Sequence, residues 1–156
     1  MQLTKYTDFA LRTLIFLGIQ PSGERVTITQ VSEHFDIPRN HLIKIVHHLA
    51  KAGFIDTVRG KGGGIRLGKP SAEINLRELV EATEETLRPV NCAHPCCPIA
   101  GHCNLQGILF GAQEAFLNEL GKHTLADLCG SDSNMSELLH LTTDRAAQKP
   151  AIRAHA

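Results

Sequence analysis

The sequence predicts a mainly α-helical fold with one small β-hairpin, and three observations carry this prediction. Apolar residues recur every three or four positions in the segments 4–19, 38–53 and 104–122, as on one face of an amphipathic helix. Between residues 54 and 68, two short β-type runs flank a glycine-rich turn, which is the pattern of a hairpin. No apolar run reaches the ~18 residues of a membrane-spanning helix, and no secretory cleavage site follows the apolar start. We therefore expect a cytoplasmic chain without a membrane partner.

The first two helices are predicted from an apolar stripe and from a cap. In the segment 4–19, apolar side chains and one threonine share a stripe that neighbouring residues widen: Phe9, Thr13 and Phe16, with Leu11, Leu14 and Ile15 beside them. A short second helix should begin after Thr27, because Gln30 stands three residues further on, at the spacing of a reciprocal capping box. It should end near Phe35, before a tight turn.

The third helix, PRNHLIKIVHHLAKAG, is the most clearly patterned element. Proline suits its first turn, where a missing N–H costs nothing, and Gly53 ends it. One face is apolar and should point to the core: Leu42, Ile45, Val46 and Leu49. The opposite face is polar: Asn40, Lys44, His47 and Lys51. Two short helices, a tight turn and a cationic hairpin in this order predict a winged helix-turn-helix domain.

Four regions follow from this pattern. The winged helix-turn-helix domain should span residues 1–84 and include a fourth helix at 76–83. A proline-rich loop with clustered cysteines covers 85–103, and a region built on a long fifth helix covers 104–129. Residues 130–156 are polar and weakly patterned, so we expect a disordered tail. The apolar side of the fifth helix is too long for so small a domain to cover alone, which predicts a homodimer that binds an inverted repeat.

A net charge of zero conceals an asymmetry that points to nucleic acid. Residues 1–70 hold ten Lys and Arg against five Asp and Glu, whereas residues 71–156 hold six against eleven. A basic half suggests that this part of the chain meets a polyanion. In the major groove, arginine can contact guanine and asparagine can contact adenine through two hydrogen bonds. The alternative is that each charged residue merely solvates an exposed face.

Seven residues are candidates for contact with double-stranded operator DNA. Four lie near the start of the third helix, where base edges are reached: Arg39, Asn40, His41 and Lys44. Three lie in the hairpin, or wing, where they would contact phosphates or the minor groove: Arg59, Lys61 and Arg66.

The cysteine loop predicts a metal centre. Cys92, Cys97 and Cys103 place three thiols on a short irregular segment that also holds three prolines. Soft thiolates select an iron–sulfur cluster or zinc, and a zinc site would be completed by His94 or His102. Three cysteines leave a four-iron cluster one ligand short. A third possibility, buried free thiols, fits a polar loop poorly.

Three segments resemble the bacterial NsrR-type nitric-oxide-sensing repressors. These are MQLTKYTDFALRTL, the run from IPRNHLIKIVHHL to RGKGGGIRLGKP, and the cysteine pattern itself. The resemblance covers about residues 1–130. The wider family also includes iron-responsive and iron–sulfur-biogenesis repressors with a similar loop.

The resemblance implies a [4Fe–4S] cluster on Cys92, Cys97 and Cys103. It implies a fourth ligand, Asp8, donated by the other subunit of a homodimer; the spacing also permits an ordinary ion pair between Asp8 and Arg12. Cys96 stands beside Cys97 and is an alternative middle ligand. Nitric oxide would then release the repressor from its operator.

Three other functions are alternatives to this hypothesis. An iron or cluster-status sensor would share the architecture and differ in its signal. A zinc-stabilised interaction module would bind no cluster. An enzyme or electron carrier is disfavoured, because the sequence has no nucleophile–base arrangement and glycines 60–64 do not open a helix as a phosphate-binding loop would.

Overall fold

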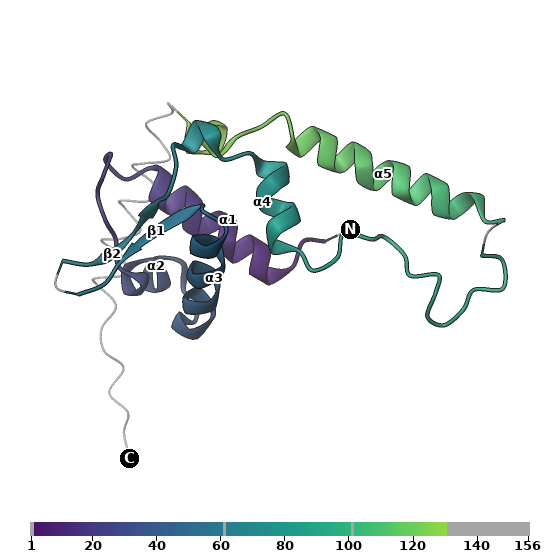
Figure 1. Ribbon diagram of the computed structural model, residues 1–156, viewed down its shortest axis with the longest axis horizontal. Helices are drawn as coiled ribbons and strands as arrows, with labels where there is room; N and C mark the ends of the chain where they lie inside the picture. Colours follow the sequence, from purple (N-terminus) through teal and green to yellow (C-terminus); the bar gives the residue numbers. More distant parts are fainter. Residues whose placement is uncertain (1, 61, 101, 131–156) are drawn as a thin grey trace, which may run out of the picture.

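The computed structural model describes residues 2–60, 62–100 and 102–130, and within these ranges the chain is mainly helical with one antiparallel hairpin (Figure 1). The predicted fold class is therefore confirmed. The predicted tail from 131 onward lies outside the described residues. The elements in chain order are α1 (Lys5–Gly18), α2 (Ile28–Phe35), α3 (Arg39–Lys51), β1 (Ile55–Val58), β2 (Gly64–Leu67), the 3-10 turn η1 (Ser71–Glu73), α4 (Leu76–Thr83), α5 (Asn104–Leu120) and α6 (Leu125–Cys129).

Helix α1 is the central element of the core. It contacts α3, α2, α4, α6 and β2, so more than one of its sides is covered. Thr13 is fully buried, and its hydroxyl is satisfied there because it donates to the carbonyl of Phe9 at 2.7 Å. The predicted stripe was only partly right, since Phe9 is half-buried while Ala10 and Leu17 are buried. A helix that packs on several sides buries residues that a single-stripe pattern leaves outside.

The helix-turn-helix forms as its local sequence predicts. The capping box between Thr27 and Gln30 is present at the start of α2. Asp36 ends that helix in the left-handed conformation (φ 53°), which aspartate tolerates better than most residues. Ser32 then holds the turn, because its hydroxyl donates to the carbonyl of Ile37 at 2.7 Å. The predicted core face of α3 is buried: Leu42, Ile45, Val46 and Leu49.

The hairpin is packed against the helices through one face. Its register pairs Ile55 with Leu67 and Asp56 with Arg66, and Ile65 is buried on the core side. The backbone N–H of Val26 donates to the carbonyl of Ile65, and the N–H of Ile65 donates to the carbonyl of Val26. This isolated antiparallel bridge extends the hairpin by one residue pair. A Cβ at Gly63 would collide with the carbonyl oxygen of Val58, so the narrow end of the hairpin requires glycine there.

Helix α5 stands away from the rest of the molecule, as Figure 1 shows. Its C-terminal end lies near α4, while its N-terminal end is reached by the long cysteine loop that runs outward from α4. After α5 the chain returns to the core: the backbone of Leu125 donates to Ile74 at 2.8 Å, and Leu125 is fully buried. No helix in the described ranges has the length and apolarity that a membrane crossing requires.

Candidate nucleic-acid interface and cysteine loop

The outer face of α3 is polar, cationic and uncovered. Its first two turns place four of the predicted DNA contacts at exposed positions: Arg39, Asn40, His41 and Lys44. Pro38 precedes the helix without any side-chain cap, and the sequence of α3 contains no acidic residue. The positive end of the helix dipole is therefore not offset by an acidic residue or a side-chain cap of α3 itself, which favours an approaching phosphate.

One apolar residue on this face was missed by the sequence analysis. Ile43 is 40% exposed, and it lies one turn beyond Asn40 and one turn before His47 on the same side of α3. The sequence does indicate this exposure, because position 43 falls outside the buried series 42, 45, 46 and 49 of the helix. An apolar side chain in the major groove can contact the methyl group of thymine.

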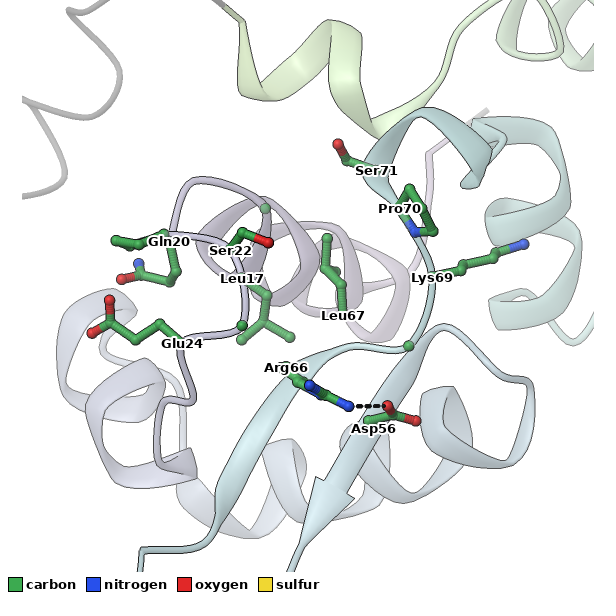
Figure 2. A pocket seen from close by; sticks show the side chains of 14 residues that line it. Leu17, Gln20, Ser22, Glu24, Asp56, Arg66, Leu67, Lys69, Pro70 and Ser71 are labelled. Atoms are coloured by element: carbon green, nitrogen blue, oxygen red, sulfur yellow. Dashed lines mark hydrogen bonds and ion pairs between the residues drawn. The ribbon is translucent and has the colours of Figure 1, made fainter.

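The three predicted wing residues have different surroundings. Arg59 is exposed at the end of β1, whereas Lys61 lies outside the described residues. Arg66 points across the hairpin to Asp56, with 3.1 Å between Nη2 and Oδ2 (Figure 2). Asp56 thus already compensates the charge of Arg66, which distinguishes it from Arg59. Contact with DNA stays a prediction for all three.

Arg66 also lines a cleft of about 500 Å³ between the hairpin and the loop that follows α1. The cleft walls include Gln20, Glu24 and Lys69 (Figure 2). Within the part of the chain that is described, Nε of Arg66 is buried without a hydrogen-bond partner. Arg66 is therefore held at the base of the wing and not at its tip.

Two ring contacts connect α1 to the recognition helix α3. The hydroxyl of Tyr6 is hydrogen-bonded to Nδ1 of His48 at 2.9 Å, and burial raises the pKa of Tyr6. The ring of Phe9 stacks on His41, with 6.4 Å between the ring centroids. Asp8 lies between these two residues in the sequence, so its helix turn is packed directly on α3.

Asp8 itself is bonded within its own chain. Its Oδ1 accepts a hydrogen bond from Nε of Arg12 at 3.0 Å, and both side chains are about half exposed. The ion pair that the sequence permitted is therefore present. A ligand role for Asp8 concerns a second subunit and stays a prediction.

The cysteines of the loop have free thiols. Cys92, Cys97 and Cys103 are partly exposed, and Cys96 is fully on the surface. The backbone N–H of Cys97 donates to the carbonyl of Cys92 at 3.1 Å, which closes a turn between two of the predicted ligands. Cys103 immediately precedes α5. The described residues nevertheless include no group of three or more ligand side chains close enough to hold a metal ion.

The chemistry of the loop still fits an iron–sulfur or zinc centre. Its donors are soft, free and reachable from solvent. The backbone hydrogen bonds seen in this loop are all local, such as those from Ala100 to Cys97 and from His102 to Ile99, so a bound metal would have few contacts to break when drawing the thiols together. Cys129 differs, because it packs against Gly18 and Ile15 of α1 and burial raises its pKa.

Comparison with solved structures shows the fold to be that of winged helix regulators. The chain is similar to CymR, described as the global cysteine regulator of B. subtilis, with a TM-score of 0.69 and 19% identity over 83% of this chain and 96% of that one. It is similar to the oxidized form of Staphylococcus aureus CymR (TM-score 0.64, 22% identity, 83% and 96% covered). It is also similar to T. potens IscR (TM-score 0.64, 17% identity, 82% and 85% covered).

A family profile is matched over most of the chain. The Rrf2 profile, described as an iron-dependent transcriptional regulator, matches residues 3–131. The chain belongs to the Rrf2 family and is a transcriptional regulator, not an enzyme.

Proposed function

We propose that this protein is a cytoplasmic nitric-oxide-sensing repressor that binds an inverted-repeat operator as a [4Fe–4S] homodimer. The observation that carries the proposal is the set of free, partly exposed thiols at Cys92, Cys97 and Cys103, on the loop that leads into the projecting helix α5. The resemblance of the cysteine spacing and of RGKGGGIRLGKP to nitric-oxide-sensing repressors supports the signal. The family description supports iron.

DNA would be bound by α3 and the wing. The exposed, uncapped start of α3 would enter the major groove with Arg39 and Asn40 toward base edges. Arg59 and Lys61 would reach phosphates or the minor groove from the wing. Arg66 would contribute only after leaving Asp56.

The cluster would be held between two subunits. Cys92, Cys97 and Cys103 would supply three thiolates from one chain, and Asp8 of the partner subunit would supply a carboxylate. When bound, the cluster supplies iron that nitric oxide can attack, most readily where an oxygen donor is the ligand. Without the cluster, Asp8 would pair with Arg12, as it does in the single chain.

Dimerisation through α5 would bring the two halves of this site together. Leu105 is 59% and Ile108 66% exposed on the N-terminal half of α5. Large apolar side chains at this exposure, following one another along a helix, favour a protein partner. A second copy would cover them and would carry its own α1 toward the cysteine loop.

A signal at Asp8 would reach DNA through α1. Tyr6 and Phe9 contact His48 and His41 of α3 on either side of Asp8 in the sequence. A pull on α1 would therefore shift the recognition helix without removing any base contact.

An iron or cluster-status sensor is the second candidate, favoured by the family description as iron-dependent. A zinc-stabilised module is the weakest candidate. One experiment separates the three: the full-length protein is purified without oxygen, its visible spectrum is recorded, and operator binding is measured before and after one pulse of nitric oxide. We expect a brown protein whose colour and operator affinity fall together. A colourless protein would contradict the cluster, and a brown protein that stays on DNA after nitric oxide would favour the iron or cluster-status sensor.

A further inference from the structure

The fully buried contact between helix α5 and the DNA-binding domain lies in the C-terminal half of the helix. Of its residues, all of which the structure describes, Leu117 alone is buried, at 3% exposure. Further toward its start, Leu109, Ala112 and Gln113 border a cleft of about 440 Å³ that separates α5 from residues 2–3, 84 and 86–89. One fully buried side chain beside such a cleft leaves the direction of the helix weakly fixed. A second fixed point is required to set the direction in which α5 leaves the domain.

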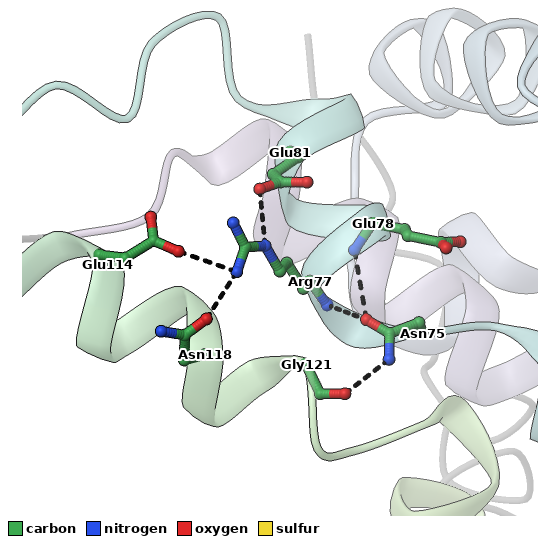
Figure 3. A network of polar contacts seen from close by, with 7 residues as sticks. All are labelled: Asn75, Arg77, Glu78, Glu81, Glu114, Asn118 and Gly121. Atoms are coloured by element: carbon green, nitrogen blue, oxygen red, sulfur yellow. Dashed lines mark hydrogen bonds and ion pairs between the residues drawn. The ribbon is translucent and has the colours of Figure 1, made fainter.

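Arg77 of α4 provides that second point (Figure 3). Its Nη1 donates to Oε1 of Glu114 at 3.1 Å and to Oδ1 of Asn118 at 2.7 Å, both on α5. Its Nε donates to Oε1 of Glu81, one turn further along α4, at 2.8 Å. Glu114 and Asn118 flank Leu117 in the sequence. The planar guanidinium therefore holds α5 on both sides of its apolar anchor while Glu81 keeps the fork in place.

The backbone end of the same residue is fixed as well. The N–H of Arg77 donates to Oδ1 of Asn75 at 2.9 Å, and Nδ2 of Asn75 donates to the carbonyl of Gly121, just after α5, at 2.8 Å. Figure 3 shows Asn75 and Arg77 reaching the end of α5 from the first turn of α4. Within the described ranges, the hydrogen bonds that join the bodies of α4 and α5 both come from Arg77.

The stabilising energy of this arrangement is small but its geometric effect is large. Exposed ion pairs contribute little to the free energy of unfolding, because solvent screens them. However, the start of α5 lies thirteen residues from Leu117, or about 20 Å at 1.5 Å per residue. A tilt of about 10° at Arg77 would move that end by about 3.5 Å, close to the ~3.4 Å rise of one base pair.

We propose that Arg77 is a positioning residue that sets the angle between α5 and the winged helix domain, and thereby the separation of the two recognition helices on the operator. This inference rests on the proposed dimerisation through α5. Arg77 does not touch DNA. It determines which spacing between half-sites the dimer accepts.

The test measures spacing preference in the full-length protein. An operator is first selected from random double-stranded DNA with the wild type, and duplexes are then made with the spacer one or two base pairs shorter or longer. Affinities are measured by fluorescence anisotropy, and oligomeric state by light scattering. Arg77→Ala removes the fork, and Arg77→Lys keeps the charge but not the fork. Lys122→Ala is the matched control, since it breaks an exposed ion pair with Glu119 that does not reach α4.

We expect wild type and Lys122→Ala to discriminate against each altered spacer by about tenfold or more. Arg77→Ala should remain a dimer, lose about tenfold in affinity for the selected operator, and accept the altered spacers almost equally well. Arg77→Lys should lie between them. If Arg77→Ala does not fold, Asn118→Ala combined with Glu114→Gln tests the same contacts from the α5 side.

A dimeric Arg77→Ala protein with the wild-type spacing profile would overturn the inference, as would an equal change in Lys122→Ala. A wild type that is monomeric, or indifferent to spacing, would instead contradict the proposed dimeric function, and the inference with it. That result would be visible before any variant was made.

Discussion

At the scale of single residues, Ile43 offers the sharpest test of how α3 contacts DNA. It is an exposed isoleucine within an otherwise polar face. If Ile43 contacts a thymine methyl group, replacing that thymine by uracil should cost the wild type about fourfold in affinity, since one buried methyl-sized group contributes ~0.8 kcal/mol. Ile43→Ala should lose this discrimination while His47→Ala keeps it. Affinities are measured by anisotropy. If uracil lowers the affinity of wild type and of Ile43→Ala equally, Ile43 does not contact the thymine methyl group.

The cysteines provide a second prediction at this scale. Replacing Cys92, Cys97 or Cys103 by alanine should abolish the visible absorption and tight operator binding together. Cys96→Ala and Cys129→Ala should keep both, because Cys97 closes the turn with Cys92 and Cys129 packs against α1. The measurements are anaerobic spectra and operator titrations on the same samples. If Cys96→Ala is colourless and Cys97→Ala is coloured, the middle ligand is Cys96 and not Cys97.

At the scale of elements, α5 is the part of the molecule whose apolar side the single chain leaves uncovered. Ile108→Glu should fold as well as wild type, because the side chain is 66% exposed in the single chain. It should not dimerise, because the interface would have to bury the new negative charge. Gln106→Glu is the control, since two residues along a helix turn to its other side. Light scattering gives the outcome. A dimeric Ile108→Glu protein with unchanged operator affinity would place the interface elsewhere.

At the scale of the whole molecule, Asp8 would join one subunit's DNA-binding domain to the other's cysteine loop. Asp8→Ala should keep some colour, because three thiolates remain, but should bind the operator more weakly. Asp8→Cys should restore a fourth, softer ligand and slow the reaction with nitric oxide.

The competing explanation is that Asp8 serves only its ion pair with Arg12. Arg12→Ala should then reproduce Asp8→Ala, and the rate of nitrosylation should be the same in both variants and in wild type. Stopped-flow absorbance under anaerobic conditions distinguishes the two explanations. An Asp8→Cys protein that reacts as fast as wild type would remove Asp8 as the point of attack while leaving the cluster itself untested by that variant.

The sequence by itself determined the five main helices and the hairpin, because each is specified by residues within a few positions of one another. The box between Thr27 and Gln30 starts α2, and the phase of Leu42, Ile45, Val46 and Leu49 orients α3. These patterns predicted the winged helix and the exposure of Asn40 and Lys44, and the cysteine spacing predicts a metal centre.

Tertiary structure decided the pairings between distant residues. The hairpin register brings Arg66 to Asp56, which changes what Arg66 can offer to DNA. Packing of α1 on several neighbours buried Ala10 and Leu17 and left Phe9 against His41. Arg77 meets Glu114 and Asn118 across 37 and 41 residues of chain. Local spacing specifies which side of a helix is apolar, but the partner of a polar side chain depends on where whole elements come to rest against one another.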